Sequence, residues 1–408
     1  MKELTIQIRS IMQPQKLLSS LLLLGLCING LHAQDSLTDI IPAGSSITKL
    51  SSNQFIFIEG PVWYRDSVLL FTDADVNPNK IYRYNPIGNQ FSVFRNNSLG
   101  SNGLTCDKAG NLLACESKRI VMMNEAGIET KILADMYNAA AFNGPNDLIA
   151  DDKGGVYFTD PVFFVTPSQD KEAVYYIDST GSIIRIIDDL ATPNGIILSP
   201  DGTKLYVVDS DNKYVYSWDV ATDGSVSGKS NLAELQTTGG VASGADGMAI
   251  DINGNIYVAS EKGIQIFSHL GAAITTIAVP EIPSNCDFGG AGFKTLYITA
   301  RKNIYSIDLN YPGYAVSRTA LPNGINTIPD KTLVEIYPNP VNDNLTIHIS
   351  DEANKGHLTI LNLNGQQLIE RQITEQQTVI DVGTLPSGVY FVKVTDDRMV
   401  EMGKFVKN

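Results

Sequence analysis

The amino-acid sequence predicts an all-β protein, a six-bladed β-propeller followed by a small antiparallel β-sandwich. Three observations support this prediction. A pattern of polar opening, apolar strand, turn and further strands recurs six times, and a different set of short strands fills the last fifth of the chain. Glycine accounts for 34 of 408 residues and only 18% of residues are charged, which suits many short strands joined by tight turns.

The first 33 residues are interpreted as a signal peptide that is removed on export. Lys2, Arg9 and Lys16 precede an apolar run over residues 17–28, and a small residue, Ala33, offers a cleavage site. An apolar run of about a dozen residues is short for crossing a bilayer, so cleavage is favoured over a membrane anchor. No transmembrane segment is therefore expected in the mature chain.

The six recurring patterns divide residues 40–317 into predicted blades. Their openings are between 39 and 52 residues apart and stand at Glu59, Asn102, Asn146, Asn194, Asp246 and Asn285. A period of about 40 to 50 residues is typical of a four-stranded propeller blade, so six openings predict six blades. A strand within residues 47–57 is expected to pair with the last blade, because closing the ring protects its edges.

After Tyr314 the pattern changes. Residues 318–332 are predicted to be a linker, because they contain proline and glycine and no clear strand. Residues 333–408 alternate short strands with turns such as Asn364-Gly365, which predicts a small antiparallel sandwich.

The C-terminal segment resembles the sorting domain of the type IX secretion system. The resemblance lies in Tyr337-Pro338-Asn339-Pro340, Asn364-Gly365, Leu385-Pro386-Ser387-Gly388-Val389-Tyr390 and the basic ending Lys404-Phe405-Val406-Lys407. It implies that the secretion machinery is a partner, that the protein passes through the periplasm, and that it is secreted or held on the outer cell surface. The alternative is a permanent spacer or carbohydrate-binding sandwich.

Charge and cysteine usage exclude some functions. A formal net charge of −14 argues against nucleic acid or an anionic membrane surface as a partner, since both require basic patches. The mature chain keeps three cysteines, and Cys106 and Cys115 flank a turn. An odd number gives no disulfide framework, so buried free thiols are favoured over a bridge.

The blade openings predict a cation site. The innermost strand of each propeller blade starts at the same end of the channel, so residues that open different blades converge. Carboxylate and amide oxygens in one ring suit a hard cation: Ca²⁺ is favoured, with Mg²⁺ and Zn²⁺ as alternatives. None of the four histidines opens a blade. Any one such Asn or Asp alone would more simply cap a turn, but the set is better explained by a cation.

Residues from about 47 to 312 resemble the SMP-30/gluconolactonase family. The resemblance lies in Glu59-Gly60-Pro61-Val62-Trp63, Pro145-Asn146-Asp147, Phe158-Thr159-Asp160-Pro161, Pro193-Asn194-Gly195, Asp246-Gly247-Met248 and Phe288-Gly289-Gly290. It implies that Glu59, Asn194 and Asp246 bind the metal and that Asn146 is either a fourth ligand or a substrate contact. It places Asn102 and Asp147 where substrate contacts are expected, and it implies hydrolysis of sugar lactones.

We therefore expect a metal-dependent lactonase. Asp246 is the first choice for a general base and Asp147 the second, because the histidine pair of paraoxonase-like relatives has no counterpart here. The short loop over residues 162–170 is expected to cover the channel mouth. Two alternatives remain: a non-catalytic propeller that binds a glycan or a protein, and an esterase or phosphotriesterase with the same metal site.

Overall fold

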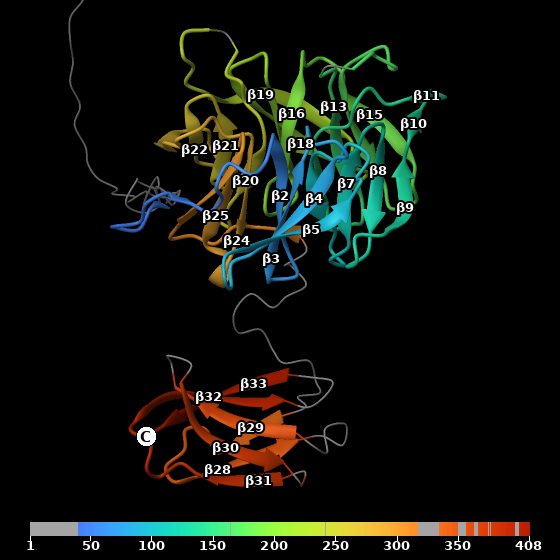
Figure 1. Ribbon diagram of the computed structural model, residues 1–408. Coiled ribbons are helices and arrows are strands. Elements are labelled where there is room, and N and C mark those ends of the chain that lie inside the picture. The colour runs from blue at the N-terminus through green and yellow to red at the C-terminus, as the bar shows by residue number, and fades with distance from the viewer. Residues whose placement is uncertain are drawn as a thin grey trace, which may run out of the picture. The chain divides into compact units, whose positions relative to one another are not determined.

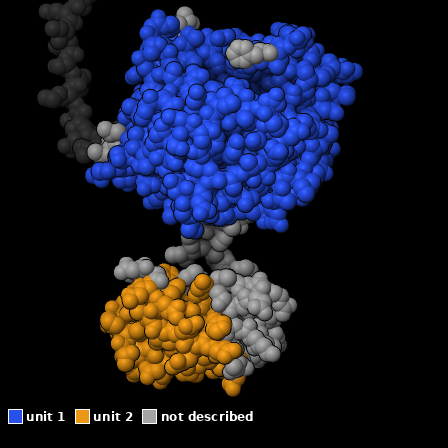
Figure 2. All heavy atoms as spheres, in the orientation of Figure 1, with its two compact units in different colours: residues 1–321 blue, residues 322–408 orange. Residues whose placement is uncertain are grey.

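The computed structural model describes residues 40–163, 165–240, 242–316, 334–349, 356–362, 366–373, 375, 377–395 and 400–408. The chain divides into two compact units, residues 1–321 and 322–408 (Figure 2). The predicted signal peptide and the predicted linker lie outside the described residues. Within the ranges that are described, no helix has the length and apolar character needed to cross a membrane.

The first unit contains six four-stranded antiparallel sheets, which are the six blades of a propeller (Figure 1). Blade 1 consists of β2 (Ile58–Tyr64), β3 (Val68–Asp73), β4 (Lys80–Asn85) and β5 (Gln90–Asn96). Blade 2 consists of β6 (Leu104–Cys106), β7 (Leu112–Glu116), β8 (Arg119–Met123) and β9 (Glu129–Ala134). A two-stranded hairpin follows, made of β10 (Met136–Tyr137) and β11 (Ala140–Ala141).

Blades 3 to 5 repeat the same order of strands. Blade 3 consists of β12 (Leu148–Ala150), β13 (Val156–Asp160), β14 (Ala173–Ile177) and β15 (Ile183–Ile187). Blade 4 consists of β16 (Pro193–Leu198), β17 (Lys204–Asp209), β18 (Tyr214–Val220) and β19 (Val226–Glu234). Blade 5 consists of β20 (Met248–Ile250), β21 (Ile256–Ser260), β22 (Gly263–Phe267) and β23 (Ala273–Ile277).

The sixth blade joins the two ends of the propeller. It consists of β24 (Asn285–Gly289), β25 (Thr295–Ala300), β26 (Asn303–Asp308) and the early strand β1 (Thr48–Lys49), with a short 3-10 helix η1 (Ala291–Phe293). Thr48 pairs with Ser306 and Lys49 with Tyr305. The expected closure by an early strand is therefore confirmed, and β24 and β25 lie beside β2 in Figure 1.

Buried side chains fill the spaces between neighbouring blades. Between blades 2 and 3, Phe142 and Phe158 pack edge to face with ring centroids 5.0 Å apart. Between blades 1 and 6, Trp63 stacks on Tyr297 with centroids 5.5 Å apart. Aromatic packing of this kind fixes each blade against the next, so the blade openings are held on a rigid frame. The three cysteines of the propeller are free and buried.

The C-terminal unit is the predicted antiparallel sandwich. One sheet consists of β27 (Val334–Tyr337), β28 (Asn344–Ile349) and β31 (Gln377–Asp381). The other consists of β30 (Gln367–Ile373), β29 (Gly356–Leu361), β32 (Gly388–Thr395) and β33 (Val400–Lys407). Alternate residues of the two sheets form the core, including the fully buried Leu345, Ile347, Leu358, Ile360, Val392 and Phe405. Alternation of this kind is typical of two packed sheets whose inner faces share one core.

Candidate metal centre in the propeller channel

The same local hydrogen bond places several of the opening residues at one level of the channel. The backbone N–H of Asn102 donates to the carbonyl of Cys115 at 2.9 Å, and Asn146 and Asp246 donate in the same way to Thr159 and Ala259 at 2.9 Å. In each case the partner lies 13 residues further along, on the second strand of the blade. The repeated spacing in the sequence thus becomes a repeated position in space.

Contacts between neighbouring blades draw the openings into a ring. The Thr72 hydroxyl donates to the Asn102 carbonyl at 3.0 Å, which ties blade 1 to blade 2. Gly103 N–H donates to the Asn146 carbonyl at 2.8 Å, and Gly247 N–H donates to the Ser284 carbonyl at 2.8 Å. The Ser284 hydroxyl donates to the Ile58 carbonyl at 2.7 Å and joins blade 6 to blade 1.

Glycine follows four of the six openings because the next blade leaves no room for a side chain. A methyl group on Gly60 would overlap the Asn102 carbonyl oxygen, and Gly60 also has a φ of 47°. A methyl group on Gly195 would overlap the backbone oxygen of Asp246, and one on Gly247 would overlap the side chain of Asn285. These close approaches bring the opening residues of successive blades into direct contact.

Three carboxylates that the sequence analysis did not single out as site residues hold the segments that enter the blades. Asp73 accepts hydrogen bonds from the backbone of residues 56 and 57, just before Glu59. In blade 3, Asp160 accepts hydrogen bonds from the backbone of residues 143 and 144, which lie just before Asn146. In blade 4, Asp209 accepts them from residues 191 and 192, which lie just before Asn194. Burial raises the pKa of Asp160 to about 6. The signal was available in the sequence, because an aspartate ends the second strand in each of these blades.

The ring concentrates negative charge in a buried place. Burial raises the pKa of Glu59 well above its ordinary value, and the nearby Asp246 and Asp147 raise it further. Burial also raises the pKa of Asp246 to about 7, with Asp147 adding to the rise, while a hydrogen bond from Asn194 and the charge of Arg301 oppose it. Ionised carboxylates crowded in this way are costly unless a cation compensates them.

Asn194 supplies an oxygen with no partner. Its side chain is buried, and its Nδ2 donates to the Ser210 hydroxyl at 3.0 Å, but its Oδ1 has no hydrogen-bond donor. A buried acceptor left unsatisfied costs about 1–3 kcal/mol, and a hard cation removes that cost. Among the described residues, no three His, Cys, Asp or Glu side chains form a metal centre by themselves. A cation here would therefore need amide oxygens as well, and the donor set of Glu59, Asn194 and Asp246 fits it.

Asp147 occupies a different level from the other predicted site residues. Together with Asp287 it lines a small chamber of about 60 Å³ that lies further along the innermost strands. Burial raises the pKa of both carboxyl groups to about 7. Asp287 accepts a hydrogen bond from the backbone N–H of Trp63 at 2.9 Å, and the Asn285 side chain hydrogen-bonds to the side chains of Asp147 and Glu59.

Several residues of this site were not assigned from the sequence. Asn285 was recognised as a blade opening but given no role, and Asp287, Ser210 and Arg301 were not considered. The predicted substrate contacts Asn102 and Asn146 are half-buried on the ring, and their role stays a prediction.

The loop expected over the channel mouth is anchored beside blade 3. The backbone N–H groups of Ser168 and Gln169 both donate to the Asn143 side chain at 2.9 Å. Phe164 of this loop lies outside the described residues. That the loop covers the mouth stays a prediction.

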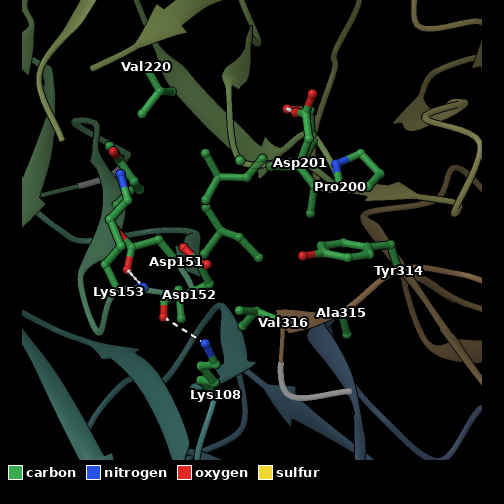
Figure 3. Close-up of a pocket in the computed structure, with 17 residues that line it drawn as sticks. Lys108, Asp151, Asp152, Lys153, Pro200, Asp201, Val220, Tyr314, Ala315 and Val316 are labelled. Atoms are coloured by element: carbon green, nitrogen blue, oxygen red, sulfur yellow. Dashed lines mark hydrogen bonds between the residues drawn. The ribbon is translucent and has the colours of Figure 1, made fainter. Parts of the chain in front are cut away.

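A larger cavity of about 280 Å³ lies at the other end of blades 3 and 4 (Figure 3). Its walls include residues 149–153 and 197–202, which end β12 and β16 and begin the following turns. Tyr314 turns its phenol group into this space, and Lys108 donates to the Asp152 carbonyl at 3.2 Å (Figure 3). Since Asn146 and Asn194 stand at the opposite ends of these strands, this cavity is separate from the ring.

The charge of the ring predicts how stability depends on pH. Asp147, Asp246 and Asp287 have a pKa of about 7 in the folded chain, above that of an unfolded aspartate. Their protonated forms therefore favour the folded state fully below about pH 4, and this contribution is lost as pH rises through about 7. In a chelator, we expect the melting temperature to fall between about pH 5 and pH 8.

Saturating Ca²⁺ should remove most of that fall, so the gain in melting temperature on adding Ca²⁺ should be larger at the higher pH. Thermal denaturation of the mature protein with and without chelator measures both quantities. An equal gain at the two pH values would contradict a cation bound by Asp246 next to these other carboxylates.

Known proteins of two kinds resemble this chain. Residues 57–302 match the family model described as the SMP-30/gluconolactonase/LRE-like region, and residues 335–408 match that of a secretion system C-terminal sorting domain. The sorting domain indicates export of the protein. A gluconolactonase of Zymomonas mobilis is 32% identical over 280 residues, which cover 61% of this chain and 77% of the relative. Regucalcin of Danio rerio is 26% identical over 249 residues, or 59% of this chain and 82% of the relative.

Solved structures share the propeller. A gluconolactonase from Xanthomonas campestris superposes with a TM-score of 0.60 at 25% identity, covering 67% of this chain and 92% of the other. A calcium-binding protein, regucalcin, from Agrobacterium tumefaciens gives a TM-score of 0.55 at 17% identity, covering 65% of this chain and 95% of the other. The second likeness is one of fold.

Proposed function

The chain belongs to the SMP-30/gluconolactonase/LRE-like family, and from that membership we propose that its propeller is a divalent-cation-dependent lactonase that opens a sugar lactone. The observation that carries the proposal is the unpartnered Oδ1 of the buried Asn194, whose side chain is hydrogen-bonded to the buried Asp246 carboxyl near Glu59. Such a group of oxygens is poorly accommodated without a cation and well accommodated with one.

The cation would be held by Glu59, Asn194 and Asp246, with Asn146 as a fourth ligand or a substrate contact. Ca²⁺ is the favoured ion because every proposed ligand is an oxygen, and Mg²⁺ and Zn²⁺ are alternatives. When bound, a divalent cation polarises the lactone carbonyl and stabilises the negative charge that develops on its oxygen.

The protein's own groups would orient the substrate and move the proton. Asp246 is the first choice for the base that takes a proton from the attacking water. Water then adds to the carbonyl carbon, the ring C–O bond breaks, and the proton passes to the leaving alkoxide. Asp147 is the second choice, although it lines the inner chamber. Asn102 and Asn146 would bind sugar hydroxyls through their amide groups.

Export of the enzyme would use both ends of the chain. Residues 1–33 would direct it to the periplasm as a signal peptide. The C-terminal sorting domain would then engage the type IX machinery and be removed, which leaves the propeller secreted or on the outer cell surface. On this proposal the lactonase acts on extracellular substrates.

Acid release from a panel of aldonolactones tests the proposed activity. We expect the mature protein to accelerate acid release, a chelator to abolish the acceleration, and Ca²⁺, Mg²⁺ or Zn²⁺ to restore it. Lactone incubated without protein gives the spontaneous rate that must be subtracted.

The alternatives predict different results in the same assay. Turnover of a phosphotriester or an aryl ester without any lactone would change the substrate class but keep the metal site. A tight glycan complex without turnover of any of these substrates would reject the enzyme in favour of a binding propeller.

A further inference from the structure

The orientation of the Asn194 amide decides whether this residue can bind a cation. The Oδ1 and Nδ2 groups of an asparagine are similar in size, so a half-turn of the amide exchanges an acceptor for a donor without changing the packing. Only the orientation that presents Oδ1 to the site provides a ligand. Something in the protein must therefore distinguish the two orientations.

We propose that Ser210 is a positioning residue that fixes the Asn194 amide with its oxygen free for the cation. This inference rests on the proposed function, because it concerns the same site. Ser210 directly follows β17, and its backbone N–H donates to the Thr192 carbonyl at 3.0 Å. The serine is thus held beside the segment that leads into Asn194.

The Asp246 carboxylate, which accepts a hydrogen bond from the Asn194 side chain, already favours this orientation, and the single proton of the Ser210 hydroxyl makes the second contribution. That proton is donated to the Ala245 carbonyl at 2.8 Å. A hydroxyl has one proton and two lone pairs, so toward Asn194 it can only accept a hydrogen bond. The group that faces it at 3.0 Å must then be Nδ2, and Oδ1 is turned away from Ser210. The reversed amide would place two acceptors against each other.

The same hydroxyl connects two of the proposed ligands. Ala245 directly precedes Asp246, so Ser210 joins the Asn194 side chain of blade 4 to the backbone that carries Asp246 in blade 5. These two hydrogen bonds restrain the distance between the two ligands as well as the orientation of the Asn194 amide. Groups that orient metal ligands typically change metal affinity by about 10- to 100-fold when they are removed.

Three variants of the mature protein test this role through cation affinity, which is measured by calorimetric titration with CaCl₂. Ser210→Ala removes the hydroxyl, and Ser210→Thr keeps it. Ser217→Ala is a matched control in the same blade: within the part of the chain that the structure describes, its buried hydroxyl hydrogen-bonds only to the Ser230 hydroxyl, at 2.8 Å. We expect Ser210→Ala to weaken Ca²⁺ binding about 10-fold or more, and the other two variants to bind as the wild type does.

The melting temperature in chelator separates positioning from folding. We expect Ser210→Ala and Ser217→Ala to differ little from each other without cation, because each loses one hydrogen-bonded hydroxyl that is at least partly buried. The gain in melting temperature on adding saturating Ca²⁺ should be reduced in Ser210→Ala alone.

Two results would overturn the proposal for Ser210. One is unchanged Ca²⁺ affinity in Ser210→Ala, and the other is an equal loss of affinity in Ser217→Ala, which would indicate a general effect of the lost hydroxyl. If the wild-type protein itself bound no Ca²⁺, Mg²⁺ or Zn²⁺, the failure would lie with the proposed metal site, and the inference about Ser210 would fall with it.

Discussion

Replacing Asp246 with asparagine is expected to abolish most of the lactonase activity while leaving the cation-free protein as stable as the wild type or more so. The substitution keeps the shape of the side chain and removes its charge. Loss of a general base typically costs about 10²- to 10⁴-fold in rate, and the loss of a carboxylate ligand adds to this. We therefore expect kcat/KM on a responsive lactone to fall by at least about 10³-fold.

The stability expected of Asp246→Asn follows from the repulsion between the carboxylates buried around position 246. Burial raises the pKa of Asp246, and Asp147 raises it further, so the ionised carboxylate is unfavourable in the folded chain without a cation. Asparagine removes that cost. Thermal denaturation in chelator should show an unchanged or higher melting temperature, together with a smaller gain on adding Ca²⁺.

Asp251→Asn is a matched control. Asp251 is a buried carboxylate of the same blade, but it follows β20 at the end opposite Asp246. It accepts hydrogen bonds from the backbone of Asn253 and Asn255, so its replacement should lower stability and spare cation affinity. Full activity of Asp246→Asn on every lactone that the wild type hydrolyses would remove Asp246 from the site.

Replacing Gly195 with alanine is expected to damage the site without touching a ligand. The new methyl group would overlap the backbone oxygen of Asp246 and lie 3.0 Å from Cγ of Met248. The backbone around Asp246 cannot easily yield, because its N–H is bonded to the Ala259 carbonyl at 2.9 Å. Blades 4 and 5 must therefore separate, which moves Asn194 away from Asp246.

Both activity and stability should fall in Gly195→Ala. Overpacking of this kind typically costs about 1–3 kcal/mol of unfolding free energy, and displacement of catalytic groups by about 1 Å can reduce the rate about 10²-fold. Urea unfolding, Ca²⁺ titration and kcat/KM measure the three effects.

Gly240→Ala adds the same methyl group where the nearest neighbouring atoms are 3.8 Å away, and it should resemble the wild type. Wild-type Ca²⁺ affinity in Gly195→Ala would mean that the close approach of the two blades does not position the site.

The architecture could be predicted from the sequence because it repeats. Each blade has a polar opening, an apolar strand and a turn in the same order. These local signals recur at a spacing equal to the length of one four-stranded blade. The six openings, the closing strand near residue 48 and the C-terminal sandwich all followed from such periodic signals. The choice of Glu59, Asn194 and Asp246 as an oxygen-rich donor set rests on the same reasoning, that a propeller brings strand starts to one end of the channel, and it stays a prediction.

The contacts across the channel were decided only by the tertiary structure. The backbone N–H of Trp63 donates to the Asp287 carboxylate, which lies 224 positions later in the sequence. The Ser210 hydroxyl donates to the Ala245 carbonyl, which lies 35 positions later. Neither pair carries a local signal, since each depends on how neighbouring blades pack. The raised pKa values, the inward position of Asp147 and the orientation of the Asn194 amide have the same origin. They arise from burial and from neighbours that become adjacent only when the ring closes.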